Sequence, residues 1–354
     1  MEYMIFAKNK KENSKQIYAS LLAVFGIFAV CGCIMYLGQS QHQDSLIQGF
    51  KIEEQEFVKF IAKHNKQYRS DEEYAKRFKI FRDNSAFIRI HNSMHLDWIL
   101  GINQFSDLLP IEFSALYISH IDYKPPTNYN KKSHIHIPSA VDWKESGAVT
   151  DVKDQGMCGS CWAFSSTGAI EGAWKISKGE LISLSEQQLV SCSNSYGNLG
   201  CNGGLMDYAF QYVKSKGITS EDKWPYGSGG GNYIECDSSL EKDSVLKISG
   251  FQDVEPESKD ALMGAISKQP VSVAVEATVG IWQHYAGGVV TEGCGTGLDH
   301  GVLAVGYDSA ADPPYYLIKN SWGNSWGLEG YIKLGISDGY GVCGINMMAS
   351  YPVV

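Results

Sequence analysis

The chain has 354 residues, which is too long for one ordinary domain and favours two or three. Hydrophobic residues make up 44% and charged residues 19%, so the chain can bury a large core and is not of the disordered class. A net charge of −9 argues against nucleic acid as a partner.

The charge is divided unevenly along the chain. Residues 1–137 carry 17 basic and 14 acidic side chains, whereas residues 138–354 carry 13 and 25. The change of sign predicts a boundary near residue 137. It also predicts an electrostatic attraction between the two parts.

Residues 17–38 are apolar and uncharged. As a helix rising 1.5 Å per residue they would span about 33 Å, enough to cross a bilayer. Lysines precede this stretch, so the positive-inside rule puts the N-terminus in the cytosol. We expect a cytosolic tail (1–16), a transmembrane signal anchor (17–38) and a stalk (39–50). A cleaved signal peptide is the alternative.

Both interpretations deliver the rest of the chain to an oxidising compartment, where disulfides form. Seven cysteines follow residue 137: Cys158, Cys161, Cys192, Cys201, Cys236, Cys294 and Cys343. Because seven is odd, three bridges would leave one thiol free.

The segment 51–93 has apolar residues at helical spacing, which predicts helices. Within it, Glu73 and Arg77 are four residues apart and can pair on one helix face. Residues 124–137 are polar, contain prolines and a Lys-Lys pair, and are typical of an exposed linker that proteases cut.

From Pro138 onward, a helical run near 161–176 comes first and strand-like segments such as 271–275 and 315–319 come later. This order favours an α+β fold with two lobes.

Glycine-rich turn residues lead from Asp154 directly into the helix that begins near Cys161. A cysteine at a helix start feels the positive end of the helix dipole, which lowers its pKa. Cys158 and Cys161 could form a zinc site, a redox pair, or a bridge partner beside a nucleophile. No second C-x2-C follows, and the other cysteines suggest disulfides, so we favour Cys161 as the nucleophile.

A thiolate nucleophile needs a base and a group that orients it. His300 lies at the mouth of the apolar strand 302–306, whereas His284 lies among aromatic residues and is interpreted as a packing or surface residue. Asn320 can accept the imidazole N–H, and Trp322 can shield that bond from water. The Gln155 amide can donate to a developing oxyanion together with the Cys161 backbone N–H.

These residues resemble the papain family of cysteine proteases, nearest its cathepsin L-like members. The segment Cys158-Gly-Ser-Cys161-Trp matches the family's cysteine signature letter for letter. The N-terminal part matches two propeptide motifs of the family. Their residues are Glu73, Arg77, Phe81, Asn84, Ile88, Asn92, Gly101, Asn103, Phe105 and Asp107.

The resemblance implies a papain-like fold over 138–354, with one helical lobe and one β-barrel-like lobe. It implies that Cys161 and His300 face each other as thiolate and imidazolium, and hydrolyse peptide bonds through an acyl-enzyme. It pairs Cys158–Cys201, Cys192–Cys236 and Cys294–Cys343. The rival interpretation, a catalytically dead relative, is weakened because Cys161, His300, Asn320 and Gln155 are all present.

The resemblance also implies a substrate-binding set: Gly203, Gly204, Leu205, Met206, Ala274, Leu298, Trp322 and Met348. The pocket for the residue two before the cut would be apolar, and Met348 should favour Leu over Phe there. Gly203 and Gly204 would lie along the substrate backbone.

Residues 51–123 would form an inhibitory propeptide, and lowering the pH should trigger cleavage near 125–137. We expect a protease that needs no cofactor and no metal, and whose partners are protein and peptide substrates. The mature form is expected to be a monomer, in an acidic endolysosomal or vacuolar lumen, or outside the cell after release.

Overall fold

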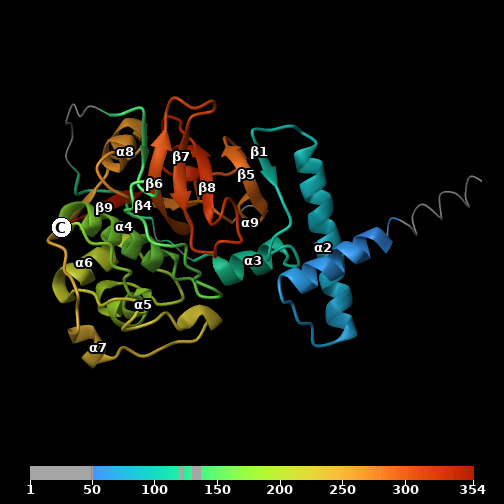
Figure 1. Cartoon of the computed structure of the whole chain (residues 1–354), viewed down its shortest axis with the longest axis horizontal. Coiled ribbons are helices and arrows are strands. Elements are labelled where there is room, and N and C mark those ends of the chain that lie inside the picture. The colour runs from blue at the N-terminus through green and yellow to red at the C-terminus, as the bar shows by residue number, and fades with distance from the viewer. Residues whose placement is uncertain (1–48, 50, 120, 122, 130–136, 279) are drawn as a thin grey trace, which may run out of the picture. The chain divides into compact units, whose positions relative to one another are not determined.

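A computed structural model describes residues 49, 51–119, 121, 123–129, 137–278 and 280–354 (Figure 1). The predicted tail, anchor and stalk therefore lie outside the described residues, except for residue 49 of the stalk. No helix in the described ranges is long and apolar enough to span a bilayer. The chain divides into two compact units, one ending at Gln67 and one beginning at Tyr68, and each is described by itself.

The first unit contains one described helix, residues 51–63. Phe57 and Phe60 stack with ring centroids 5.9 Å apart on this helix. The helix ends in a turn where Asn65 adopts a left-handed φ of +49°. The expected helical segment 51–93 is thus two helices with a break at 64–70.

Helix α2 (Asp71–Asn92) begins the second unit. Ser70 caps it by accepting a hydrogen bond from the Glu73 backbone N–H. The first turn carries three acidic residues and the last turn carries basic ones, which complements the helix dipole. The face that carries Phe78, Phe81 and Ile88 is buried.

Nine strands form one sheet in the order β1-β5-β8-β7-β6-β4-β9-β3, with β2 paired to β6 beside this path. The bounds are β1 Trp98–Leu100, β2 Ala140–Asp142, β3 Gly250–Asp253, β4 Val271–Val275, β5 Tyr285–Val290, β6 His300–Asp308, β7 Tyr315–Lys319, β8 Tyr331–Gly335 and β9 Ala349–Val353. The sheet is open, not a closed barrel, because β1 and β3 end it without pairing to each other.

In the part from residue 138, four helices (α4 to α7) precede seven strands (β3 to β9), as the α+β prediction requires, while β2 comes before them and α8 and α9 lie between strands (Figure 1). Their bounds, with those of the other elements, are α3 Pro110–Tyr117, α4 Cys161–Lys178, α5 Glu186–Cys192, η1 Ser193–Tyr196, α6 Met206–Lys216, η2 Ser228–Gly230, α7 Ser238–Lys242, α8 Lys259–Ile266, α9 Gly280–His284 and η3 Val342–Gly344. The first four turns of α4 are buried on all sides, since α5, α6 and β6 pack around it.

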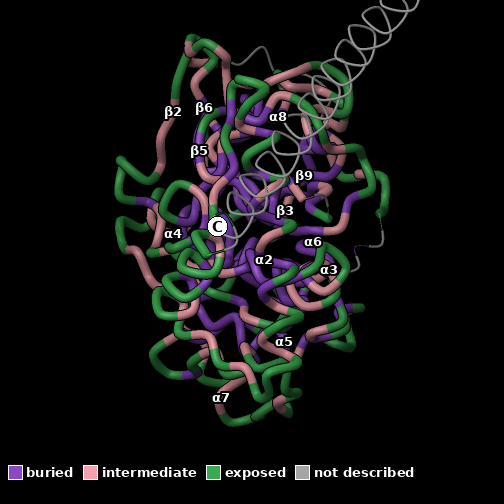
Figure 2. Tube along the Cα trace, turned by 90° about the vertical axis from the view of Figure 1, so that its right-hand side faces the viewer, coloured by how far each residue is buried: buried purple, intermediate pink, exposed green. Residues whose placement is uncertain are grey.

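The core has two parts, which appear as the purple interior of Figure 2. One part lies around the sheet and contains Trp282, Trp322 and Trp326. The other lies around α4 and α6. The N-terminal segment, residues 68–123, contributes Trp98 and Phe105 to the first core and Ile121 to the second. This segment and the part from residue 138 therefore share both cores.

Candidate active site

Cys161 is the first residue of α4, and it is fully buried. Its Sγ accepts a hydrogen bond from the backbone N–H of Gly301 at 3.2 Å. Gly301 directly follows His300, the first residue of β6. The contact between α4 and β6 therefore brings the cysteine and the histidine, which are 139 positions apart in the sequence, to one site.

His300 is oriented by Asn320, which directly follows β7. The Nε2 atom of His300 lies 2.8 Å from Oδ1 of Asn320, which also accepts the Ser321 backbone N–H. The Trp322 ring stacks on the imidazole, with centroids 4.7 Å apart and an interplanar angle of 25°. The other ring nitrogen, Nδ1, is buried and has no hydrogen-bond partner among the described residues. In this covered form it makes no hydrogen bond to the Cys161 sulfur.

Two more tryptophans, which the sequence analysis did not identify, pack beside the stacked His300 and Trp322 rings. Trp282 on α9 meets the His300 ring edge-on at 6.0 Å. Trp326 stacks on Trp282 at 6.0 Å, and its Nε1 donates to the Trp282 carbonyl. The aromatic cluster near His284 was the only signal in the sequence, and it gave no reason to link α9 with His300.

Gln155 lies in the loop before α4 and is buried. Its Nε2 donates to the carbonyl oxygens of Tyr117, at 3.1 Å, and Cys158, at 3.0 Å. Its Oε1 accepts a hydrogen bond from Ser321 Oγ at 2.7 Å. The amide is thus held with its N–H groups toward a carbonyl that comes from the N-terminal segment.

That segment covers the site. The Ser119 Oγ atom lies 3.0 Å from Sγ of Cys161, and the Ser119 backbone N–H donates to the Asp299 carbonyl at 3.2 Å. Two residues on, Ile121 is buried in the same apolar cluster as Met206. The atom next to the thiol is a hydroxyl oxygen, so no peptide carbon is presented for attack.

Burial shifts the pKa values of the pair. It raises the pKa of the Cys161 thiol and lowers the pKa of His300 to about 4. In the covered form both groups are therefore neutral at pH 7. These shifts favour the neutral pair over the expected thiolate and imidazolium in this state, because burial disfavours both charges.

The residues expected to bind substrate are buried, apart from the half-buried Gly204. Leu205, Met206, Ala274, Leu298 and Met348 are buried and belong to the apolar cluster that contains Ile121. Trp322 is also buried. Gly203 needs its glycine because φ is +115°. A Cβ on Gly204 would lie 2.4 Å from Asn198 Oδ1 and 2.8 Å from the Trp162 ring, so packing alone requires a glycine there.

The motif residues of α2 hold the N-terminal segment together. Arg77 pairs with Glu112 at 2.6 Å and donates to the Asp107 carbonyl at 2.9 Å. Asn84 donates to the carbonyls of Ser106 and Leu108. Asn92 exchanges two 2.9 Å hydrogen bonds with the backbone of Leu100. Phe81 and Ile88 are buried.

The second propeptide motif, residues 101–107, binds the N-terminal segment to α9 and packs it against β5. Gly101 donates to the His284 carbonyl at 2.8 Å, and a Cβ on Gly101 would lie 2.9 Å from that of Ala286. Asn103 donates to the Gln283 carbonyl, while Gln283 Nε2 donates to the carbonyl of Phe105. The contacts are neutral hydrogen bonds between complementary groups. Asp107 instead accepts the Tyr68 hydroxyl at 2.9 Å.

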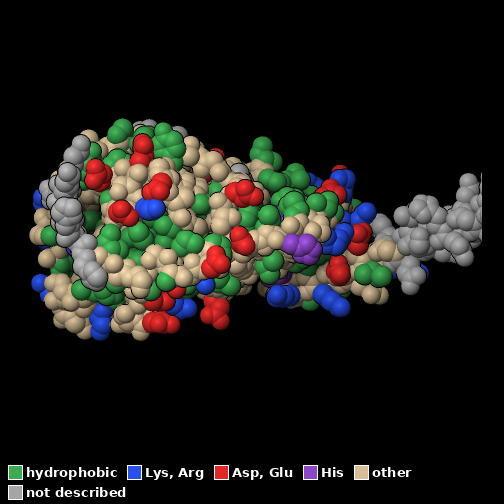
Figure 3. Space-filling view, turned by 90° about the horizontal axis from the view of Figure 1, so that it is seen from above, with side chains coloured by type: hydrophobic (Ala, Val, Ile, Leu, Met, Phe, Trp, Pro, Cys, Tyr) green, Lys and Arg blue, Asp and Glu red, His purple; other side chains and the backbone are tan. Residues whose placement is uncertain are grey.

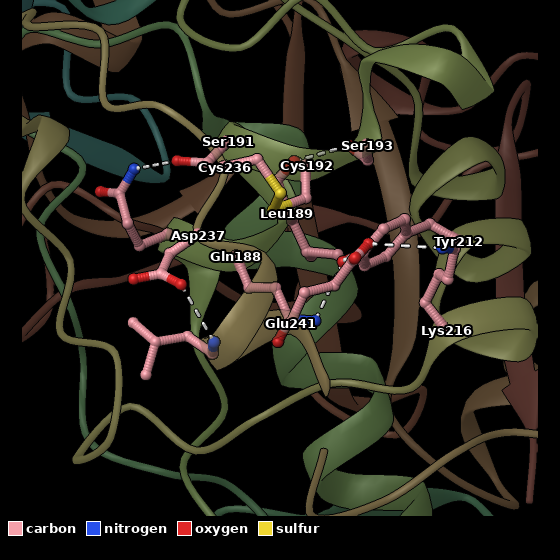
Figure 4. The surroundings of a disulfide bond; sticks show 12 residues. Gln188, Leu189, Ser191, Cys192, Ser193, Tyr212, Lys216, Cys236, Asp237 and Glu241 are labelled. Carbon is pink, nitrogen blue, oxygen red and sulfur yellow. Dashed lines mark hydrogen bonds and ion pairs between the residues drawn. A yellow bond between two sulfur atoms is a disulfide. The ribbon is translucent and has the colours of Figure 1, made fainter. Parts of the chain in front are cut away.

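Disulfides join Cys158–Cys201, Cys192–Cys236 and Cys294–Cys343, and Cys161 is a free thiol. Because Cys158 is bonded to Cys201, the zinc and redox interpretations of the C-x2-C pair are wrong. Cys192, Cys236 and Glu241 form the one group of potential metal ligands among the described residues (Figure 4). Its sulfurs are bonded to each other and are unavailable to a metal.

A buried ionic cluster is connected to the residue that precedes Asn320. Lys153 Nζ lies 2.7 Å from Glu186 Oε1 and 3.3 Å from Glu171 Oε1. Thr150 Oγ1 donates to Glu171 and accepts from Lys319, the residue before Asn320. Acidic side chains are scattered over the face in Figure 3 and are not gathered in one patch.

Comparisons with known proteins agree with this geometry. Residues 137–353 match the family described as papain family cysteine protease, and residues 57–113 match the cathepsin propeptide inhibitor domain (I29). The Germination-specific cysteine protease 1 of Arabidopsis thaliana is 45% identical over 320 residues, which cover 84% of this chain and 83% of that protein. The Senescence-specific cysteine protease SAG39 of Oryza sativa subsp. japonica is 41% identical, over 94% and 98% of the two chains.

Solved structures are similar over both parts. A recombinant stem bromelain precursor has a TM-score of 0.79 at 36% identity and covers 85% of this chain and 99% of its own. A digestive procathepsin L 3 of the Tenebrio molitor larval midgut has a TM-score of 0.77 at 39% identity, with the same coverage.

Proposed function

Because the chain belongs to the papain family of cysteine proteases and is made as a proenzyme, we propose that it is an endopeptidase whose nucleophile is Cys161. The observation that carries this proposal is the free thiol at the start of α4, held 3.2 Å from the backbone N–H next to His300. His300 then acts as the general base that takes the thiol proton and as the acid that protonates the leaving amine.

The remaining roles follow from the hydrogen bonds. Asn320 holds the imidazole through its Nε2, and the stacked Trp322 ring keeps water from that bond. Gln155 Nε2 stabilises the oxyanion of the tetrahedral intermediate together with the Cys161 backbone N–H. The Tyr117 carbonyl that Gln155 now binds supports this role, because it is the kind of oxygen that a substrate would place there.

The substrate pocket is proposed to take an apolar residue, preferably Leu, two positions before the cut. Buried Ile121, which lies in the same apolar cluster as Met348 and Leu298, supports this preference. A charged side chain would lose its hydration in such surroundings.

Processing and location complete the proposal. The propeptide, residues 51–123, inhibits by covering the thiol, and acid releases it with cleavage within 124–137, ahead of the catalytic part 138–354. Residues 17–38 anchor the chain in a membrane, with residues 1–16 in the cytosol and 39–50 as a stalk. The uncharged apolar stretch supports this part. The protease then works as a monomer in an acidic lumen, or outside the cell after release.

The test is acid incubation of the purified chain with a fluorogenic peptide that carries Leu two residues before the cut. We expect hydrolysis to appear together with loss of the propeptide. The matched control is Cys161→Ala, which removes only the sulfur. Equal hydrolysis by the two chains would refute the proposed nucleophile.

A further inference from the structure

The linker that follows the propeptide is bound at β3, the terminal strand of the sheet. The backbone N–H groups of Thr127 and Asn128 both donate to Oδ2 of Asp253, each at 2.8 Å. The Asp253 backbone N–H donates in return to the Asn128 carbonyl at 3.0 Å. One backbone hydrogen bond and two hydrogen bonds to a carboxylate thus hold the linker beside β3, and the linker does not form a further strand there.

The site also contacts one side chain of the linker. The Asn128 side-chain amide donates to the Phe251 carbonyl at 3.0 Å, and Gln252 Nε2 donates to the Asn128 carbonyl. Three successive residues of β3 therefore bind Asn128 through its N–H, its carbonyl and its amide. Thr127 itself is exposed, and only its backbone N–H is used.

The acceptor belongs to the enzyme and is already in place. Asp253 is only 7% exposed, although Thr127 and Asn128 lie at the surface. β3 packs against α6 and pairs with β9 on its other side (Figure 2). A fixed carboxylate that accepts two successive N–H groups makes charge-assisted hydrogen bonds, which are stronger than neutral ones.

We propose that Phe251, Gln252 and Asp253 form a second peptide-binding site, the β3 site, which is separate from the catalytic groove. Its ligand is an extended peptide with an Asn side chain, preceded by a residue that keeps its backbone N–H. The occupant is the Thr127-Asn128 segment of this chain. After the linker is cut beyond residue 129, that segment stays bound and slows release of the severed propeptide.

The donor requirement can be tested without catalysis. In the Cys161→Ala chain, residues 130–136 are replaced by the recognition sequence of an added sequence-specific protease and cut once. The dissociation rate of the severed propeptide from the immobilised enzyme is then measured at pH 7. Thr127→Pro removes one donor, and we expect roughly tenfold faster release, as for loss of a hydrogen bond to a charged group. Thr127→Ala keeps the N–H and is expected to leave the rate unchanged.

The enzyme side is tested in the same assay. Asp253→Ala removes the acceptor of two hydrogen bonds and should speed release at least as much as Thr127→Pro. Adding Thr127→Pro to it should have little further effect, because the bond that Thr127→Pro removes is then already absent. Equal rates for Thr127→Pro and Thr127→Ala would overturn the proposal. So would additive effects of Thr127→Pro and Asp253→Ala. Both linker variants leave the enzyme's own residues intact, so the comparison of Thr127→Pro with Thr127→Ala cannot reflect misfolding of the enzyme.

A second experiment tests binding in trans. A labelled peptide of residues 123–129 is titrated into the enzyme after the severed propeptide has been removed in acid and the pH returned to 7. We expect saturable binding that a Leu-containing groove inhibitor does not displace, and at least tenfold weaker binding of the Asn128→Ala peptide. Equal affinity of the two peptides, or displacement by the inhibitor, would contradict the β3 site.

Discussion

Replacing His284 by phenylalanine is expected to make the proenzyme less sensitive to acid. The His284 side chain is 1% exposed, and both ring nitrogens are buried without a hydrogen-bond partner among the described residues. Phe87 of α2 packs near it, with ring centroids 6.4 Å apart, and the His284 carbonyl accepts the Gly101 N–H. Burial lowers the pKa of His284 to about 4.

The sign of the effect follows from this lowered pKa. An exposed histidine has a pKa of about 6.5, so the unfolded chain takes up a proton at a higher pH than the folded chain does. The contribution of neutral His284 to stability is complete above pH 6.5 and is lost as the pH falls toward 4. Between pH 7 and pH 5 the loss is about 2 kcal/mol if unfolding fully restores the ordinary pKa.

The assay is urea unfolding of the full chain at pH 7 and pH 5, in the Cys161→Ala background that prevents self-cleavage. The free energy of unfolding should fall between these pH values by about 2 kcal/mol less in His284→Phe than with His284 present. All other titrating groups, His300 among them, are common to both chains and cancel. His284→Leu serves as a second variant in case the phenyl ring fits poorly.

If both chains lose the same free energy between pH 7 and pH 5, the reasoning about His284 is wrong. If the reasoning holds, and because Phe87 belongs to the propeptide, the pH at which the active enzyme releases its propeptide should also move lower in His284→Phe.

Four further predictions concern the site and its support. Asn320→Ala should lower kcat by about 10- to 100-fold with little change in KM, because it removes the hydrogen bond that orients the imidazole but no contact with the substrate. Steady-state kinetics on the Leu peptide measure this. Peptides with Leu two residues before the cut should be cleaved with a higher kcat/KM than peptides with Phe there. Met348→Ala should reduce this Leu-to-Phe ratio of kcat/KM. Lys153→Met should lower the free energy of unfolding by about 3–5 kcal/mol, because it leaves buried carboxylates without their cation, as denaturant titration would reveal. Arg77→Ala, which removes the pair with Glu112, should speed acid activation in a time course.

The parts of the site that the sequence predicts are those with local signals. A glycine-rich turn before a helix indicated Cys161, and polar residues at strand ends indicated His300 and Asn320. The strands 271–275 and 315–319 have the predicted bounds, because short runs rich in β-branched and aromatic residues favour strands.

What the sequence did not predict depends on contacts between distant segments. Ser119 contacts the thiol only because the propeptide crosses the site. Trp282 contacts His300 only because the fold brings α9 next to the start of β6. The expected pairing of Glu73 with Arg77 is replaced by two other contacts. Glu73 accepts the Arg69 backbone N–H, and Arg77 turns to Glu112. Arg77 therefore pairs with Glu112, which is distant in the sequence, and not with its helical neighbour Glu73.

The electrostatic picture changed as well. A dipole-activated thiolate was the natural expectation for a cysteine at a helix start, but burial raises the pKa of the Cys161 thiol, although the Ser119 hydrogen bond lowers it. The extent of this burial depends on tertiary contacts, which no local pattern in the sequence encodes.

The most direct measurement is the site of labelling by a thiol-directed epoxide before and after acid processing, with the modified residue mapped by mass spectrometry. The account requires no labelling of the covered proenzyme at pH 7, and stoichiometric labelling of Cys161 with complete loss of peptide hydrolysis once the propeptide has gone. Full hydrolysis that survives modification of this sulfur, or labelling that bypasses it, would contradict the account.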